Sequence, residues 1–417
     1  MKTLLFTRYL YAADEVVLSL LFALLNKKDL FKCYWWAYEL YYSEFDIKPI
    51  IWQMYYDFYA QLNPFLEKYI QSKLIKMDSG DETALACIIK NLFNKTTTDS
   101  VFCIRLSFDK VTFPNSIYRG KLPKWLEDYD KKYHNLLRSL KSRNWINTIY
   151  YIKKLLKNND LTSKFENNNI QTNYTEFENI YLTICNYIDK QEEYIALKFN
   201  EQKIIDLFNR IKYDNYIHRL IALLAFIWSP VEKLNINRIF VIPTQEEIDF
   251  IKNTNAPLDL NKFNNPQVYN TISIKRLYKI SKKISCFALN QDEFNYDYNS
   301  LINQYLYNWE YHCSQTPIWV KRFKQFGVCF DDETYQPIFP NDDYQELFYD
   351  SYGYEMDESH VWNKAQYSFP QLKSISKKEF NLSKWLEKVF ENNDEDIRLG
   401  LDNIKISIKR QPYYIFN

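Results

Sequence analysis

The chain is poor in glycine and lacks the short motifs that mark the common catalytic sites. It has five glycines in 417 residues, where average usage of about 7% would give roughly 29. This scarcity argues against glycine-rich phosphate loops, dinucleotide-binding turns and tightly turned β-barrels. The patterns GxxxxGK[ST], GxGxxG, HExxH and GxSxG are all absent. We therefore expect a protein that is not an enzyme, with no catalytic residues, no cofactor and no metal site.

The chain also lacks paired cysteines, long apolar runs and an excess of either charge. Its seven cysteines are scattered without a CxxC pair, which favours a reducing compartment over a zinc knuckle or a disulfide framework. No apolar run reaches the roughly 18 residues that a membrane helix needs, and the N-terminus has no signal-peptide cleavage pattern. With 53 basic and 52 acidic residues, any binding of nucleic acid must come from a local patch.

Aromatic residues are abundant, with 36 Tyr, 29 Phe and 10 Trp. In the first hundred residues they alternate with aliphatic residues at a 3.6-residue period, which predicts amphipathic helices. Asp14 and Asp29 are placed to cap two of these helices, and Ser79-x-x-Glu82 has the pattern of a capping box. The predicted helices span 15–25, 30–42, 50–59, 65–74 and 84–93.

Short connections between such helices favour antiparallel pairs. We therefore predict a mainly α fold, in which antiparallel helical hairpins stack as an irregular HEAT-like array, with a minor β element toward the C-terminus. The rings of 34–59 are predicted to be buried between neighbouring helices; the alternative is a cation-binding aromatic cage, which needs rings converging on one point.

Two asparagine-rich stretches, 158–173 and 253–271, are candidate boundaries. Between them, the strand-like run 238–242 precedes a second capping-box pattern, Thr244-x-x-Glu247. Helices are further predicted over 201–213, 216–228 and 272–287, and strands over 404–408 and 413–416. The predicted domains are an N-terminal helical array at 1–108, a middle helical domain at 109–252 with a helical pair at 125–157, and an α+β domain at 272–417.

The helical pair carries a candidate binding face. No Asp or Glu occurs between 131 and 157, and aromatic residues are interleaved with the cations. Clustered cations can bind phosphates and exposed rings can stack on bases, but the same rings also fit the buried stripe of an ordinary solvated helix. The candidate basic residues are Lys131, Lys132, Arg138, Lys141, Arg143, Lys153, Lys154 and Lys157.

A second candidate region is acidic. From 331 to 358 there are ten Asp or Glu residues and no Lys or Arg. Carboxylates that converge can hold a metal ion for hydrolysis, but neighbouring acids are more often solvated or docked against a basic surface, either a partner's or the 131–157 face of this chain. The candidate acidic residues are Asp331, Asp332, Asp342, Asp343, Glu346 and Glu355.

Nucleophilic catalysis has little support in the sequence. His312-Cys313 is the only adjacent Cys/His pair among four histidines. Neighbouring residues on a helix point about 100° apart, so these two side chains are poorly placed to share a proton.

Three stretches of the chain carry a resemblance. They are 29–70, with Tyr34-Trp35-Trp36-Ala37-Tyr38-Glu39-Leu40-Tyr41-Tyr42-Ser43 and Tyr55-Tyr56-Asp57-Phe58-Tyr59-Ala60; 309–322, with Trp309-Glu310-Tyr311 and Thr316-Pro317-Ile318-Trp319; and 346–358, with Glu346-Leu347-Phe348-Tyr349 and Tyr352-Gly353-Tyr354-Glu355. Together they resemble an uncharacterised conserved protein of giant DNA viruses of the mimivirus type. The resemblance implies a viral lineage and a setting in the host cytoplasm, in the viral factory or the virion, and it brings no catalytic residues.

From these features we expect a non-enzymatic helical scaffold that binds a protein partner through the acidic segment or the N-terminal array. The alternative is RNA binding through the basic face, as in a HEAT-like scaffold of translation initiation, an analogy of fold and setting alone. No membrane association is expected.

Overall fold

The structure is a computed structural model of the chain. It describes residues 5–98, 101–102, 111–157, 174–189, 220, 224, 239–254 and 308–352, apart from positions 10, 12, 64, 112, 115–116, 119–120 and 143. The predicted helices at 201–213 and 272–287, nearly all of that at 216–228, the predicted strands at 404–408 and 413–416, the 158–173 stretch and Glu355 lie outside these residues. The described residues confirm a mainly α fold with a small antiparallel sheet toward the C-terminus.

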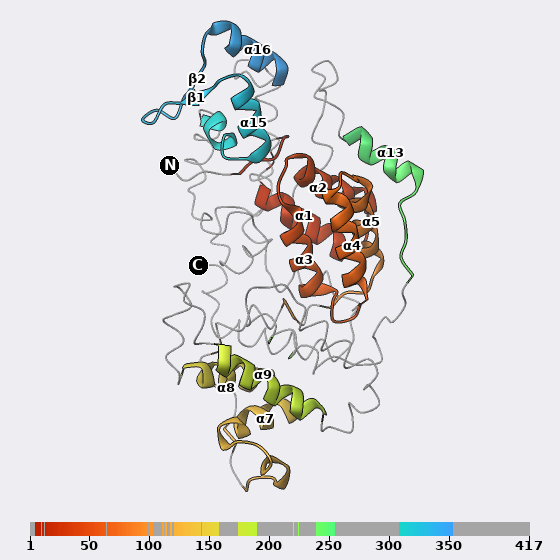
Figure 1. Cartoon of the computed structure of the whole chain (residues 1–417), viewed down its shortest axis with the longest axis vertical. Coiled ribbons are helices and arrows are strands. Elements are labelled where there is room, and N and C mark those ends of the chain that lie inside the picture. The colour runs from red at the N-terminus through yellow and green to blue at the C-terminus, as the bar shows by residue number, and fades with distance from the viewer. Residues whose placement is uncertain are drawn as a thin grey trace, which may run out of the picture.

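Five helices form the N-terminal part. They are α1 (Ala13–Asn26), α2 (Leu30–Tyr42), α3 (Ile47–Phe58), α4 (Leu66–Asp78) and α5 (Thr83–Asn94). Helix α1 packs on α2 and α4 packs on α5, each pair joined by a short connection, and α2 also packs on α5 (Figure 1). Stacking of these hairpins into an irregular HEAT-like array remains a prediction.

The capping residues explain where several of these helices begin. Asp29 caps α2 as predicted, because its carboxylate accepts from the amide of Lys32 at 3.1 Å. Helix α1 begins at Ala13, so Asp14 lies inside its first turn and is not the cap. The capping box predicted at Ser79 does not form: Ser79 ends α4, and Asp81 accepts from the amide and hydroxyl of Thr83 instead.

Most of the aromatic residues predicted to lie in the core at 34–59 are buried there, whereas Tyr41, Tyr42 and Trp52 are partly buried against it. Tyr34, Trp36 and Tyr38 are fully buried, and Tyr55 and Tyr59 are buried beside them. They pack among the aliphatic side chains of α1 and α5 in one hydrophobic core. Rings that fill the space between helices cannot also form an open cage, so the cage alternative is excluded for these five.

A second group of helices carries the basic face. It comprises two short 3-10 turns, η1 (Lys124–Leu126) and η2 (Lys131–Tyr133), followed by α7 (His134–Lys141), α8 (Trp145–Lys157) and α9 (Tyr174–Asp189). Helix α8 packs against both α7 and α9. The helical pair predicted at 125–157 is thus confirmed as helical, and its first helix is divided into η1, η2 and α7.

Residues 308–352 form a compact aromatic unit. The helical residues 308–313 lead to α15 (Pro317–Gln325), a hairpin of β1 (Cys329–Phe330) and β2 (Pro337–Ile338), and α16 (Asp342–Tyr352). In the hairpin, Cys329 pairs with Ile338 and Phe330 with Pro337. Buried Phe348 of α16 stacks on Phe323 of α15 with ring centroids 5.1 Å apart.

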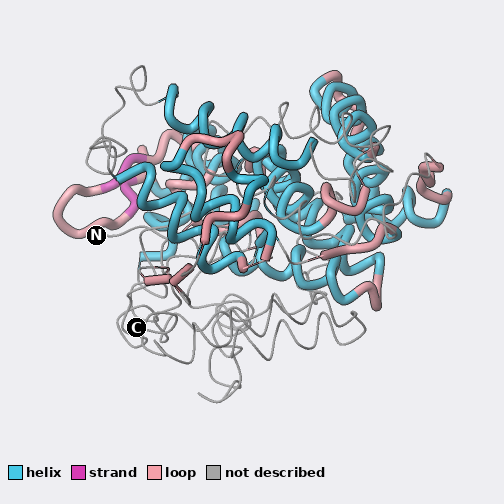
Figure 2. Tube along the Cα trace, turned by 90° about the horizontal axis from the view of Figure 1, so that it is seen from below, coloured by secondary structure: helices cyan, strands magenta, loops and turns pink. Residues whose placement is uncertain are grey.

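The two charged regions lie at opposite ends of the molecule. Figure 1 shows α7, α8 and α9 at one end of the long axis and the β-hairpin with α16 at the other, with α1–α5 between them. The view from below, in Figure 2, shows the predominance of helix among the described residues and the small patch of strand. The described part of the acidic segment therefore does not dock on the chain's own 131–157 face.

Among the helices that the structure describes, none combines the length and the apolar character that crossing a bilayer demands.

Candidate functional site

Residues 239–254 lie across the surface of the N-terminal helices, far from them in sequence. An extended stretch, 239–243, runs beside α5 and α4, and α13 (Gln245–Thr254) then packs against α2 (Figure 1). We call residues 239–254 the docked segment and the surface of α2, α4 and α5 beneath it the platform. Of the predicted strand at 238–242, residues 239–242 are described; they are extended but have no strand partner within the described residues.

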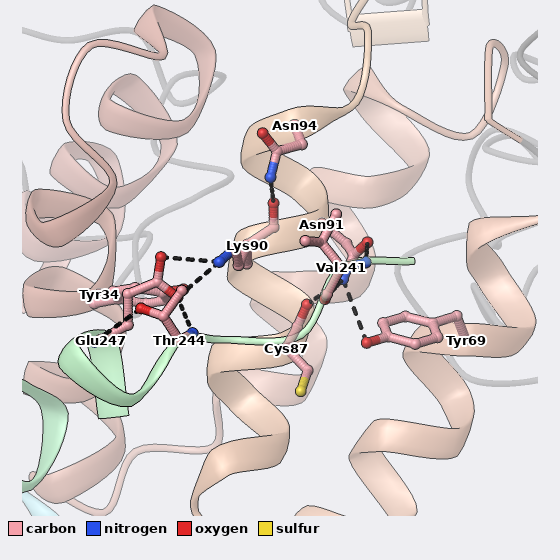
Figure 3. Close-up of polar contacts among 9 residues, drawn as sticks. All are labelled: Tyr34, Tyr69, Cys87, Lys90, Asn91, Asn94, Val241, Thr244 and Glu247. Carbon is pink, nitrogen blue, oxygen red and sulfur yellow. Dashed lines mark hydrogen bonds and ion pairs between the residues drawn. The ribbon is translucent and has the colours of Figure 1, made fainter. Parts of the chain in front are cut away.

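Asn91 of α5 binds both the amide and the carbonyl of one residue in the docked segment. Its Nδ2 donates to the carbonyl oxygen of Val241 at 2.8 Å, and its Oδ1 accepts from the amide of Val241 at 3.0 Å (Figure 3). The same Nδ2 also donates to the carbonyl of Cys87 at 2.7 Å, which fixes the side chain on its own helix. A carboxamide can make this double contact because it carries a donor and an acceptor side by side.

Side chains on both sides of Asn91 hold the neighbouring residues of the docked segment. The ring of Phe240 stacks on Tyr69 of α4, with centroids 4.1 Å apart and planes 15° apart. Lys95 Nζ donates to the carbonyl of Ile239 at 3.3 Å and lies 5.7 Å from the centroid of Phe240. Extended backbone is thus bound at the carbonyls of two alternate residues, 239 and 241, and the aromatic side chain of the residue between them stacks on α4.

Glu247 is the ionic contact between α13 and the platform. Both of its carboxylate oxygens lie 2.9 Å from Lys90 Nζ, and the Tyr34 hydroxyl donates to Oε2 at 3.2 Å (Figure 3). The side chains of Lys90 and Glu247 are each only 10% exposed. Burial, followed by the neighbouring Glu247 carboxylate, raises the pKa of Tyr34.

The capping box predicted at Thr244-x-x-Glu247 positions this carboxylate. The amide of Thr244 donates to Glu247 Oε2 at 2.8 Å, and the amide of Glu247 donates to Thr244 Oγ1 at 3.4 Å. The turn that starts α13 therefore also aims Glu247 at Lys90, so one side chain both caps the helix and binds the platform.

The far end of α13 is held by Arg8. Its guanidinium donates to the carbonyl of Thr254 at 2.8 Å and forms an ion pair with Glu39 of α2 at 3.0 Å. A cation at the C-terminus of a helix is favourable because the helix dipole is negative there. Burial raises the pKa of Glu39, and the Arg8 charge lowers it part of the way back.

The docked segment keeps most of its aliphatic side chains away from the platform. Ile239 and Ile242 are 70% and 71% exposed. The groups that it contacts on the platform include polar and cationic ones, namely Lys90, Asn91, Lys95 and the hydroxyl of Tyr34, and the rings of Phe31 and Tyr69. The interface therefore mixes polar and apolar contacts, as a contact between two chains does.

The candidate basic residues divide into exposed and structural ones. Arg138 donates to the carbonyl of Lys121 at 2.9 Å and is half-buried, and Lys153 is half-buried as well. Tyr133 and Tyr151 are buried, so these rings belong to the hydrophobic core and are not free to stack on bases. Arg143 and the side chain of Lys157 lie outside the described parts. The candidates that remain exposed are Lys131, Lys132, Lys141 and Lys154.

The candidate acidic residues do not converge. Asp331 accepts from the amides of Glu333 and Thr334, at 3.0 and 2.6 Å, and shapes the β-hairpin turn. Asp342 and Asp343 lie in the first turn of α16, where the helix dipole favours anions. These residues, with Asp332 and Glu346, are exposed or half-exposed. Within the described ranges, no group of three His, Cys, Asp or Glu side chains is placed to hold a metal ion.

Within the aromatic unit, His312 and Cys313 are both fully buried. Burial lowers the pKa of His312 to about 4 and raises that of Cys313 well above its usual range. A thiol held in its neutral form beside a weakly basic imidazole is a poor nucleophile. The pair is therefore part of the core.

Sequence reasoning did not identify the platform. Asn91 and Val241 are 150 residues apart, and neither residue type carries a local signal for such a contact. The one available signal was Thr244-x-x-Glu247, which predicts the start of α13 but not the lysine that it meets. Comparisons of the chain with family profiles, curated proteins and solved structures give no match.

Proposed function

We propose that the protein is a non-enzymatic helical scaffold that binds a protein partner. The observation that supports this most directly is the pair of hydrogen bonds between Asn91 and the main chain of Val241. Recognition of extended main chain is a general way to bind a polypeptide, because it gives affinity without demanding a particular sequence. The α2–α4–α5 surface of this protein has the chemistry for it.

The acidic face of α16 is a second candidate site for a protein partner. Asp342, Asp343 and Glu346 are exposed on α16, together with Tyr344 and Leu347, which are 45% and 56% exposed. Carboxylates beside apolar side chains favour a partner that is basic, with an apolar contact at its centre. In the setting that the giant-virus resemblance implies, the partner would be met in the host cytoplasm or in the virion.

Site-specific photo-crosslinking tests the scaffold function. A photoreactive residue is placed in the full chain at Lys73, whose Nζ lies 5.5 Å from the ring centroid of Tyr69 on the platform, or at one of two exposed apolar positions, Leu347 and Leu182. We expect a defined polypeptide to crosslink at 73 or 347 but not at the control position 182, and the identified protein to bind the purified chain. Crosslinks to nucleic acid alone, or equal labelling at the three positions, would contradict the proposal.

RNA binding through α7 and α8 is the second candidate. Lys131, Lys132, Lys141 and Lys154 are exposed, with no acidic residue between 131 and 157. Because the interleaved Tyr133 and Tyr151 are buried, such binding would be to phosphates and weakly dependent on sequence. A translation-type role would be a special case of this candidate.

The salt dependence of binding tests this candidate. For single-stranded RNA, we expect replacing the four lysines by Gln to flatten the plot of log affinity against log salt by about 0.7 per lysine. Replacing Lys68 and Lys76 of α4, which are also exposed, should leave the slope unchanged. Equal slopes for the two sets, or no measurable affinity at low salt, would exclude the basic face as an RNA site.

A further inference from the structure

We infer that the docked segment is an internal ligand, and that a partner polypeptide of matching chemistry binds the platform by replacing it. The inference rests on the proposed scaffold function and specifies its site and its regulation. The partner segment would be extended, with an aromatic side chain one residue before the position read by Asn91, and would lead into a helix whose third residue is a carboxylate.

Three contacts define these requirements. Asn91 binds the amide and the carbonyl of a single residue, the donor and the acceptor that extended polypeptide main chain presents together. Tyr69 supplies a flat ring to an aromatic neighbour. Lys90, only 10% exposed, requires a carboxylate with both oxygens in reach, which Glu247 now provides at 2.9 Å.

The platform is suited to exchange because the polar groups that hold the docked segment can bind water when it leaves. Lys90, Lys95, Asn91 and the hydroxyl of Tyr34 would each regain water in place of the bonds that they lose. The packing of α1 on α2 and of α4 on α5 does not involve the docked segment. The apolar losses are the stacking of Phe240 on Tyr69, the contact of Phe250 with Phe31, whose ring centroids are 5.0 Å apart, and the burial of Ile251.

A tethered segment competes with any partner at an effective concentration of the order of millimolar. The wild-type platform is therefore closed to weak ligands, and a partner gains access when it binds more tightly or when the docked segment is released. This arrangement restricts the scaffold to partners that reproduce all three contacts.

A labelled peptide with the sequence of residues 239–254 tests the inference in the full-length chain. Its affinity is measured by fluorescence anisotropy for the wild type and for a chain in which Phe240→Ala and Glu247→Gln weaken the internal ligand. We expect at least about tenfold tighter binding to the weakened chain, because the competitor has been disabled. Adding Asn91→Ala to the weakened chain should remove most of that gain.

Matched peptides show which groups are recognised. A peptide carrying Glu247→Gln should bind about tenfold more weakly, whereas Glu246→Gln, the same change at the neighbouring exposed residue, should bind like the parent. Equal affinity of the peptide for the wild-type and weakened chains would overturn the inference. So would equal affinities of the two altered peptides.

A measurement on the wild type covers the case in which the weakened chain does not fold. Millimolar peptide should speed hydrogen exchange of the amides of α13, since the peptide displaces the docked segment, while exchange in α7 stays unchanged. If hydrogen exchange in α13 stays unchanged, the peptide does not displace the docked segment and the inference is wrong. That result would leave the scaffold function intact, because a partner found by crosslinking at Leu347 binds elsewhere.

Discussion

At the scale of single residues, the platform depends on polar side chains that each make several contacts. Asn91 contacts the carbonyls of Cys87 and Val241, the amide of Val241 and the hydroxyl of Tyr69. It is fully buried. Burying a carboxamide costs free energy unless its donor and acceptor groups are hydrogen-bonded. Removing this side chain also leaves its partner groups without their hydrogen bonds.

We predict that Asn91→Ala lowers the free energy of unfolding by about 1–3 kcal/mol, because it removes both part-buried hydrogen bonds to the main chain of residue 241. The matched control is Asn94→Ala, one turn along the same helix, where the exposed side chain bonds only the carbonyl of Lys90. We expect a change within about 0.5 kcal/mol for the control. Urea unfolding measures both, and similar losses for the two variants would show that the Val241 contact carries no special weight.

Helix-capping residues were among the features predicted best from the sequence. Asp29 and Thr244-x-x-Glu247 were recognised because a cap depends on residues only a few positions apart. Ser79-x-x-Glu82 failed for an equally local reason: Gly80 has a φ of +89° and ends α4, which leaves Asp81 nearer than Ser79 to the start of α5. Asn91 could not be found, since its partner is distant in sequence.

At the scale of elements, periodicity predicted helix type well and boundaries less well. Helix α2 has the predicted bounds 30–42, whereas α4 continues to Asp78, beyond the predicted end at 74. The rings of α2 and α3 were assigned to the core because they occur on all sides of their helices, and such helices must be enclosed. The minor β element was predicted near the C-terminus, but the hairpin at 329–338 was not, because its strands are two residues long.

The helical residues 308–313 carry two buried groups whose proton binding has opposite effects on stability. Burial raises the pKa of Glu310 from 4.5 to about 7, while Tyr349 donates to its carboxylate at 2.9 Å. Burial lowers the pKa of His312 from 6.5 to about 4. The N-terminal charge also lowers the pKa of His312, and the Glu310 and Arg322 charges act in opposite directions on the pKa of the adjacent Cys313.

The sign of each effect follows from proton counting. Between pH 4.5 and 7 the folded chain keeps Glu310 protonated while the unfolded chain releases the proton, so this group makes stability fall as pH rises. Between pH 4 and 6.5 the unfolded chain protonates His312 and the folded chain does not, so this group makes stability rise with pH. The two contributions oppose each other across pH 4.5–6.5.

We therefore predict that single substitutions reveal pH dependences of the free energy of unfolding that oppose each other in the wild type. Relative to the wild type, Glu310→Gln should make stability rise more steeply from pH 4.5 to 7, and His312→Phe should make it fall from pH 4 to 6.5. Each difference should reach roughly 3 kcal/mol across its range. Urea midpoints at four pH values provide the measurement, and parallel profiles for all three proteins would contradict the assignment.

At the scale of the whole molecule, segments distant in sequence are joined by a few buried polar contacts. The docked segment is held on α2, α4 and α5, and the 308–352 unit is held on the N-terminal segment. In the second case Trp319 Nε1 donates to the carbonyl of Thr7 at 3.1 Å, and His312 meets Phe6 edge to face. Arg8 follows directly in the chain and holds α13, so residues 6–8 contact both distant segments.

This connection predicts that the 308–352 unit and the docked segment are coupled through the N-terminal segment. Trp319→Phe keeps an aromatic ring but leaves the buried carbonyl of Thr7 without its donor, which should cost about 1–3 kcal/mol. Hydrogen exchange should then speed up both at residues 308–313 and in α13, because both contact residues 6–8. Lys321→Ala, which removes the exposed pair with Glu44, is the control and should cost no more than about 1 kcal/mol. Faster exchange at 308–313 with α13 unaffected would show that the two contacts are independent and that the docked segment opens on its own.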